Sequence, residues 1–142
     1  FFKVAPINHR LYLNSYFSVV TETAFVENSY FSSEKIYRPM LHYHPFILYG
    51  SPFTLKVLKE LGFRTFHPFI DESYDEIISP QKRAISIFKE IKRLCRMSEN
   101  EIHDWFLELK HILIHNRELI YEKGKQYKKN AFNIFDEIYK EL

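Results

Sequence analysis

The chain has 142 residues, of which 46% are hydrophobic and 18% aromatic, and its formal net charge is +2. This length and composition suit a folded domain with a real core and argue against a disordered chain. The small net charge argues against a dedicated nucleic-acid binder, and no apolar run is long enough to cross a membrane. A single cysteine, Cys95, excludes an internal disulfide. The chain begins with Phe1 rather than methionine, so we expect it to be a piece of a longer protein.

The first readable element is a strand over residues 17–21, which are rich in β-branched and aromatic side chains. Residues 10–16 before it fit either a short helix or an entry strand. Glu22 follows the strand, so we expect a carboxylate at the carboxyl end of a core strand. Such an acid either accepts a sugar or ribose hydroxyl or caps a backbone N–H in a loop; the sequence leaves both open.

A helix is predicted to begin near Ser33, a residue type that caps helix N-termini. Lys35 and Arg38 then fall in or near its first turn, where the helix dipole disfavours cations. A bound anion such as a phosphate would explain them, because free N–H groups and side-chain charge would hold it together. The alternative is that both side chains simply reach into water. Pro39 predicts a kink or an early end.

Residues 45–49 form a continuous apolar run between proline and glycine, which is typical of a strand buried on both faces of a parallel sheet. Gly50 and Ser51 follow it, and we expect Ser51 to cap a helix over residues 53–61. Gly62 fits a left-handed helix end. Residues 63–66 then read as a short third strand, so the order of elements indicates a parallel α/β sheet.

These residues resemble the donor-binding half of GT-B glycosyltransferases, and among those the α-1,3-fucosyltransferase family. The resemblance rests on Glu22 at a strand end, on the helix start Ser-Glu-Lys-Ile-Tyr-Arg-Pro-Met at 33–40, and on the strand Pro-Phe-Ile-Leu-Tyr-Gly at 45–50. It covers roughly residues 16–76. The family's Phe-Glu-Asn-Ser run has a counterpart at 25–29 with an extra valine, so either Glu22 or Glu27 is the equivalent acid.

The resemblance implies roles for these residues. Lys35 would neutralise the donor diphosphate, with Arg38 as a weaker second cation, so that no metal or other cofactor is needed. Glu22 and Glu34 are the candidate catalytic acids, and Glu22 or Glu27 would hold sugar or ribose hydroxyls. A general base and the glycan or other acceptor would come with a preceding domain. The further candidate substrate-binding residues are Ser33, Gly50, Ser51 and Asp71.

Acidic side chains follow the third predicted strand, over residues 67–79. Asp71 and Glu72 are the best placed of these to face a ligand cleft, and the family has a corresponding acidic loop. No spacing among them is typical of a metal site, and a solvated loop is the alternative. The histidine pairs His42/His44 and His111/His115 also lack the pattern of a zinc motif, so we expect them to be structural or exposed.

The remaining residues are predicted to be helical. Ser79-Pro80 and Ser98 followed by Glu101 are helix starts, and Gly124 is a candidate helix end. Apolar stripes at helical spacing predict core or packing surface. They comprise Ala84, Ile87, Phe88, Ile91, Leu94 and Cys95, then Ile102, Trp105, Phe106, Leu109, Ile112, Leu113, Leu119 and Ile120, and last Phe132, Phe135, Ile138, Tyr139 and Leu142. On this pattern Cys95 should be a buried, inert thiol.

Together these features predict an α/β fold: a Rossmann-like small parallel sheet with flanking helices over residues 1–78, and a helical C-terminal extension over 79–142 packing on it. The favoured function is a nucleotide-sugar-dependent, fucosyltransferase-like glycosyltransferase fragment that binds the donor diphosphate through Lys35 and helix N-termini. The alternative is a non-catalytic interaction module, such as a degenerate transferase half. The sequence names neither the sugar nor the nucleotide.

Overall fold

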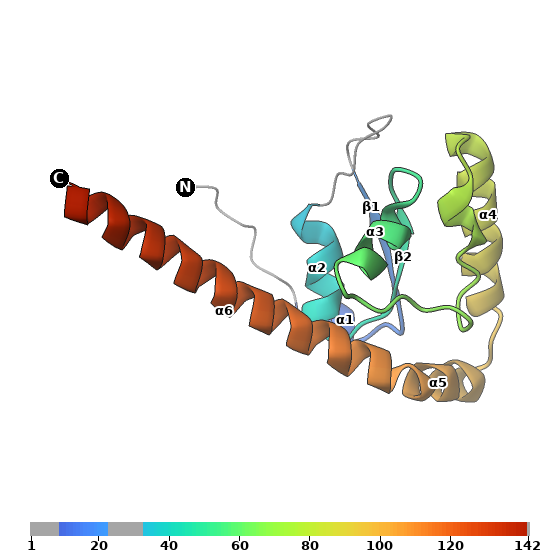
Figure 1. Ribbon diagram of the computed structural model, residues 1–142. Coiled ribbons are helices and arrows are strands. Elements are labelled where there is room, and N and C mark those ends of the chain that lie inside the picture. The colour runs from blue at the N-terminus through green and yellow to red at the C-terminus, as the bar shows by residue number, and fades with distance from the viewer. Residues whose placement is uncertain (1–8, 23–32, 142) are drawn as a thin grey trace.

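The structure, a computed structural model, describes residues 9–22 and 33–141. A short parallel sheet and the helices around it form a body from which the last helix extends (Figure 1). The elements in chain order are α1 (His9–Leu13), β1 (Ser18–Thr21), α2 (Glu34–Leu41), β2 (Phe46–Tyr49), α3 (Thr54–Glu60), the 3₁₀ helix η1 (Ser73–Glu76), α4 (Pro80–Leu94), α5 (Glu99–Glu108) and α6 (Lys110–Glu141).

The two strands pair in parallel, with Ser18 opposite Phe46 and Thr21 opposite Tyr49. Helix α2 connects them and packs on both. The first three side chains of β2 are all buried, because helices and loops cover both of its faces. On β1 only Val20 is buried, and Val19 is 46% exposed. The predicted α/β class and the parallel pairing are therefore confirmed.

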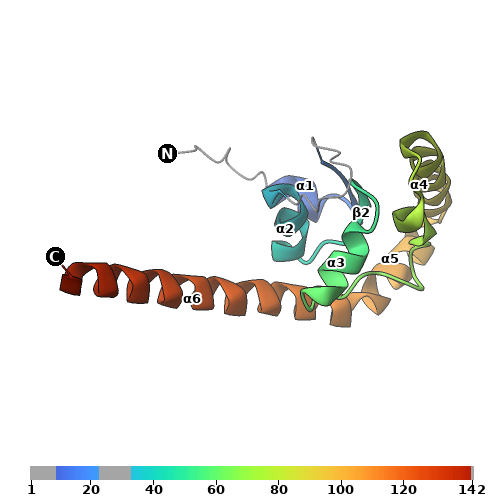
Figure 2. The ribbon, with the colours of Figure 1, turned by 45° about the horizontal axis from the view of Figure 1, so that its top comes forward.

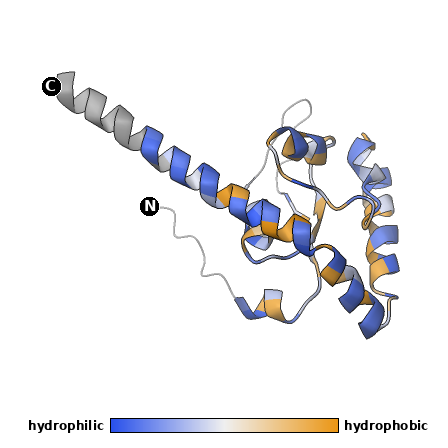
Figure 3. Cartoon of the chain, turned by 60° about the horizontal axis from the view of Figure 1, so that its bottom comes forward, coloured by the Kyte–Doolittle hydropathy of each residue, from blue (hydrophilic) through white to orange (hydrophobic). Residues whose placement is uncertain are grey.

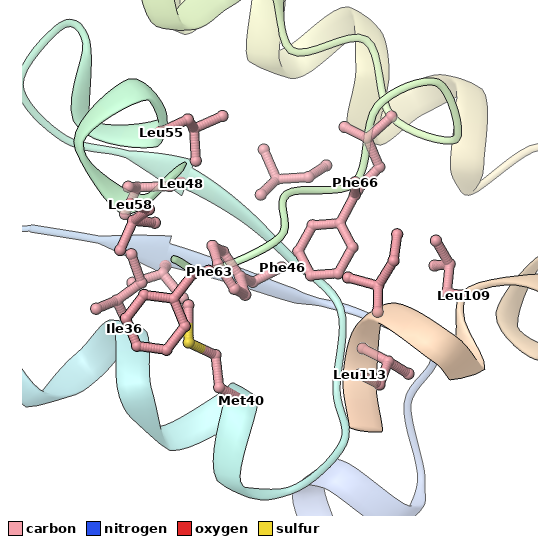
Figure 4. Close-up of a cluster of buried hydrophobic side chains, with 14 of the residues drawn as sticks. Ile36, Met40, Phe46, Leu48, Leu55, Leu58, Phe63, Phe66, Leu109 and Leu113 are labelled. Atoms are coloured by element: carbon pink, nitrogen blue, oxygen red, sulfur yellow. The ribbon is translucent and has the colours of Figure 1, made fainter. Parts of the chain in front are cut away.

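One hydrophobic core joins the sheet region to the C-terminal helices (Figure 4). The rings of Phe46 and Phe66 meet edge to face, with centroids 5.0 Å apart. Buried side chains from every layer surround this pair, which makes the core continuous across the chain. They include Ile36 and Met40 of α2, Leu48 of β2, Leu55 and Leu58 of α3, Phe63, and Leu109 and Leu113 at the α5–α6 junction.

Residues 63–66 do not form the predicted third strand. Side chains rather than a neighbouring strand bond the backbone of Arg64 and Phe66. The amide of Asn116 accepts from Arg64 N and donates to Arg64 O, both at 2.8 Å. The Glu72 carboxylate accepts from Phe66 N at 2.6 Å and from the Thr65 hydroxyl at 2.7 Å. Glu72, expected to face a ligand cleft, is buried here.

The start of α3 also differs from the prediction. Ser51 does not cap the helix; its carbonyl accepts from the Thr54 hydroxyl at 2.7 Å inside the preceding turn. Phe53 holds the N-cap position with a left-handed φ of 63°. The Asp75 carboxylate supplies the missing cap, because its two oxygens accept from the N–H groups of Leu55 and Lys56. Gly62 has φ +92°, so the predicted left-handed end of this helix is confirmed.

Helices α4 and α5 begin where the sequence predicts, but the single helix expected over residues 99–123 is divided, because α5 ends at Glu108 and α6 begins at Lys110. Ser79 caps α4 with Pro80 as its first residue, and Ser98 and Glu101 form the capping box of α5. The end predicted at Gly124 is wrong, because α6 continues through it. A glycine inside a helix costs only about 1 kcal/mol relative to alanine, which a long helix tolerates. No helix in the described part of the chain is long and apolar enough to span a membrane.

Helix α4 is rotated relative to the predicted stripe. Phe88 is 69% exposed and Cys95 is also exposed, so the burial predicted for the Cys95 thiol is wrong. Arg83 and Glu90 are buried in their place. Polar bonds explain this rotation. Arg83 Nη1 donates to Ile77 O at 2.6 Å, and Glu90 accepts from Asp71 N at 3.1 Å while pairing with Arg93.

Candidate functional site

The N-terminus of α2 is built on a buried carboxylate. Glu22, 3% exposed, accepts from Ser33 N at 2.9 Å and from the Ser33 hydroxyl at 2.6 Å. Ser33 in turn caps the helix by accepting from Lys35 N at 3.3 Å. The predicted cap is therefore confirmed. Both Glu22 oxygens have hydrogen-bond partners, so in this structure the acid positions the helix start.

An open groove of about 270 Å³ lies between β1 and α2. Two cations line it: Lys35, whose Nζ donates to Thr21 O at 3.2 Å, and Arg38. No acidic side chain is among the described residues that line it. Its other walls are formed by Tyr12, by Ser18, Val19, Val20 and Thr21 of β1, and by Pro39. The groove is therefore positive, and Lys35 lies at the carboxyl end of β1.

Arg38 is only partly neutralised. Its Nη2 lies 3.5 Å from Glu34 Oε1, one helical turn back, in a pair whose Glu34 side chain is 62% exposed. Exposed pairs of this kind contribute little, about 0.3–0.5 kcal/mol. Arg38 Nε is buried and has no hydrogen-bond partner among the described residues. Because the pair with Glu34 is weak and exposed, the charge of the guanidinium remains largely available to an anion in the groove.

The turn after β2 lies against Glu22 rather than in the groove. A Cβ on Gly50 would stand 3.6 Å from Glu22 Cγ, an ordinary contact, so the strand ends meet closely here. Ser51 is 5% exposed, and its hydroxyl has no hydrogen-bond partner among the described residues. Asp71 is exposed and caps a local turn by accepting from Ser73 N at 3.0 Å, a bond that lowers the pKa of its carboxyl.

The candidates therefore separate into three groups. Lys35 and Arg38 share the groove, with Ser33 and Glu34 at the helix start beside them. Glu22, Gly50 and Ser51 are buried where the two strands end, and Asp71 does not line the groove. Glu27 lies outside the described residues. Tyr12 and Ser18 line the groove but had no signal in the sequence, because both precede the strand end and match no motif.

The histidines near the groove make structural contacts. His44, 2% exposed, bonds Ser18 Oγ through Nδ1 at 2.9 Å and Ser15 O through Nε2 at 2.8 Å. Burial lowers the pKa of its imidazole. His42 contacts His9 Nδ1 at 2.8 Å. No cluster of three or more histidine, cysteine or acidic side chains suited to a metal ion occurs within residues 9–22 and 33–141.

A second, smaller groove of about 170 Å³ lies at the start of α3. Asp75 and Glu72 form part of its wall, and Lys59 Nζ lies 3.4 Å from Glu72 Oε2. Burial raises the pKa of the Asp75 carboxyl, although the two α3 N–H groups that it accepts from oppose that shift. Because these acids already hold the chain together, this groove is the weaker candidate.

Comparisons of the chain with protein-family models, with curated proteins and with solved structures gave no match.

Proposed function

We propose that this chain is the donor-binding, Rossmann-like part of a nucleotide-sugar-dependent glycosyltransferase of the GT-B type, similar to the α-1,3-fucosyltransferases. One observation carries the proposal: Lys35 and Arg38 of α2 line a single groove along β1, with Lys35 at the carboxyl end of the strand and no acid among the described lining residues. In open α/β sheets, ligands bind at the carboxyl ends of the strands. A donor diphosphate is the ligand that this groove suits.

Electrostatics supply the chemistry in this proposal. As the bond from the sugar to the diphosphate breaks, negative charge grows on the leaving phosphate oxygens. Lys35 and Arg38 stabilise that charge in the groove, whereas the N–H groups of Ser33, Lys35 and Ile36 at the start of α2 are already bonded within the chain. Lys35 is held by Thr21 O at 3.2 Å, so its ammonium is already close to the strand end. The groove, at about 270 Å³, suits a diphosphate rather than a whole nucleotide sugar.

The acids take different parts in this account. Glu22 acts as a positioning residue, since its two bonds to Ser33 fix the start of α2 and with it the position of Lys35. Glu34 is exposed at the helix start and remains the candidate to accept a sugar hydroxyl. On binding, Glu34 and Arg38 would give up their ion pair and each contact the ligand instead.

Isothermal titration calorimetry with GDP, UDP and CMP tests the proposal. We expect saturable binding of one nucleotide, weakened about tenfold or more in Lys35→Ala, because a charge-assisted bond to phosphate is lost. Lys125→Ala, an exposed lysine on α6, is the matched control and should bind normally. A folded chain that binds none of the three nucleotides argues against the proposal.

The long last helix favours a second candidate, a non-catalytic interaction module. Helix α6 spans 32 residues, about 48 Å, and its second half extends away from the body (Figures 1 and 2). Most side chains over residues 121–130 are exposed. A helix that leaves the body in this way offers its surface to a partner. The apolar stripe predicted from Phe132 onward lies outside the described side chains.

A further inference from the structure

Helix α4 exposes apolar side chains on its outward face. Phe88 is 69% exposed and Ile85 is 56% exposed, and they lie three residues apart on one side of the helix. Ile78, just before the helix, is 64% exposed. Figure 3 shows hydrophobic residues along this helix, which lies at the opposite side of the body from α2. We call Ile78, Ile85 and Phe88 the α4 ridge.

The exposed charges of helix α4 itself are all of one sign. Helix α4 carries six charged side chains, and the only acid among them, Glu90, is buried. Its exposed charged residues are therefore all basic: Lys82, Lys89, Lys92 and Arg93. Lys82 and Lys89 are seven residues apart, which places them along one side of the helix.

The rotation of α4 is fixed, so this exposure is built into the fold. Arg83 is 2% exposed and donates to Ile77 O, and Glu90 accepts from Asp71 N. Arg93 bonds Glu90 and also donates from Nη2 to Phe69 O at 2.8 Å. Turning Phe88 inward would break these buried bonds, and each break leaves an unsatisfied polar group.

We propose that the α4 ridge and its basic row dock on an anionic membrane surface. An aromatic ring and two aliphatic side chains that stand out from a helix suit the boundary between headgroups and acyl chains, and flanking lysines attract anionic headgroups. A second copy is disfavoured, because two all-basic faces repel. Nucleic acid offers no apolar surface that would reward dehydrating Ile85 and Ile78. In this proposal α4 lies on the membrane surface and does not cross the bilayer.

Co-sedimentation of the full chain with lipid vesicles tests this surface independently of nucleotide binding. We expect binding to phosphatidylcholine vesicles that contain phosphatidylglycerol, weak binding to phosphatidylcholine alone, and loss of binding as salt increases. Ile85→Ser/Phe88→Ser should reduce the bound fraction about tenfold, and Lys82→Gln/Lys89→Gln should do the same. All four side chains are exposed, so circular dichroism should show folded variants.

Matched controls come from other helices. Leu107→Ser on α5 removes a leucine that is 51% exposed, and Lys123→Gln/Lys125→Gln on α6 removes two charges. Both should bind vesicles like the unmodified chain. The proposal is overturned if the folded chain does not bind anionic vesicles, or if the control variants lose as much binding as the ridge variants. A dimer in sedimentation velocity that the ridge variants abolish would assign the surface to a second copy instead.

Discussion

Asn116 offers the sharpest test of how the fold is held together. Its amide is 1% exposed and makes two bonds of 2.8 Å to the backbone of Arg64, one to the N–H and one to the carbonyl. These bonds take the place of strand pairing for residues 63–66. Asn116→Ala removes both and leaves two backbone groups without their partner.

The expected cost follows from those two bonds. Leaving a buried backbone group unsatisfied costs about 1–3 kcal/mol, and water reaches Arg64 more easily than it reaches the core. We therefore expect Asn116→Ala to lower the free energy of unfolding by about 3 kcal/mol, a large share of the 5–15 kcal/mol typical of a domain. Urea denaturation followed by far-ultraviolet circular dichroism measures this as a lower midpoint with an unchanged slope.

Asn100→Ala is the matched control, because Asn100 is exposed in α5. It should change stability by less than about 0.5 kcal/mol. If Asn116→Ala costs no more than this control, the reasoning is refuted. The burial of Phe63 and Phe66, rather than the Asn116 amide, would then hold the segment.

Three further predictions concern the backbone, a helix cap and pH. Gly62→Ala should lower the free energy of unfolding by about 1–2 kcal/mol, since Gly62 has φ +92° and an added Cβ would stand 3.4 Å from Leu119. Gly124→Ala should instead stabilise α6 by up to about 1 kcal/mol. Thermal melts of the two variants measure the difference. Asp75→Ala should lower the free energy of unfolding by about 1–2 kcal/mol in urea denaturation, because the α3 cap is lost. Asp75→Asn should lower it less, because asparagine keeps one acceptor and removes the buried negative charge; burial also raises the pKa of the Asp75 carboxyl. Burial lowers the pKa of His44, so the unfolded chain takes up the proton first as pH falls. Stability should therefore decrease below about pH 6.5, and urea midpoints should show a flatter pH dependence in His44→Gln.

The elements with strong local signals could be predicted from the sequence. The apolar run of β2, the serine caps at Ser33, Ser79 and Ser98, and the left-handed Gly62 each depend on a few neighbouring residues. Local chemistry decides such features, so a single sequence carries them.

The features that the sequence did not predict depend on residues far apart in the chain. Asn116 bonds a segment 52 positions away, and Asp75 caps a helix from 20 positions downstream. The rotation of α4 follows from the bonds of Arg83 and Glu90, which outweigh the apolar stripe. No local sequence pattern predicts these distant partners.

The candidate site was predicted in part. The pairing of Lys35 and Arg38 on one helix followed from their three-residue spacing and the cap at Ser33. For Glu22 the sequence offered two roles, and the structure shows the second, a cap on a backbone N–H; that its partner is Ser33 could not be foreseen, because this requires the strand end and the helix start to meet in space. Tyr12 lines the groove from α1, a segment that the sequence predicted as either a helix or a strand.

The central claim is that the two cations of α2 hold a diphosphate. The most direct measurement compares the affinity of a nucleoside diphosphate with that of its monophosphate, by calorimetry, on the unmodified chain and on Lys35→Ala/Arg38→Ala. We predict that the diphosphate binds the unmodified chain at least about tenfold more tightly, and that this preference disappears in the double variant. A preference that survives in the double variant, or a folded chain that binds both nucleotides equally, would contradict the account.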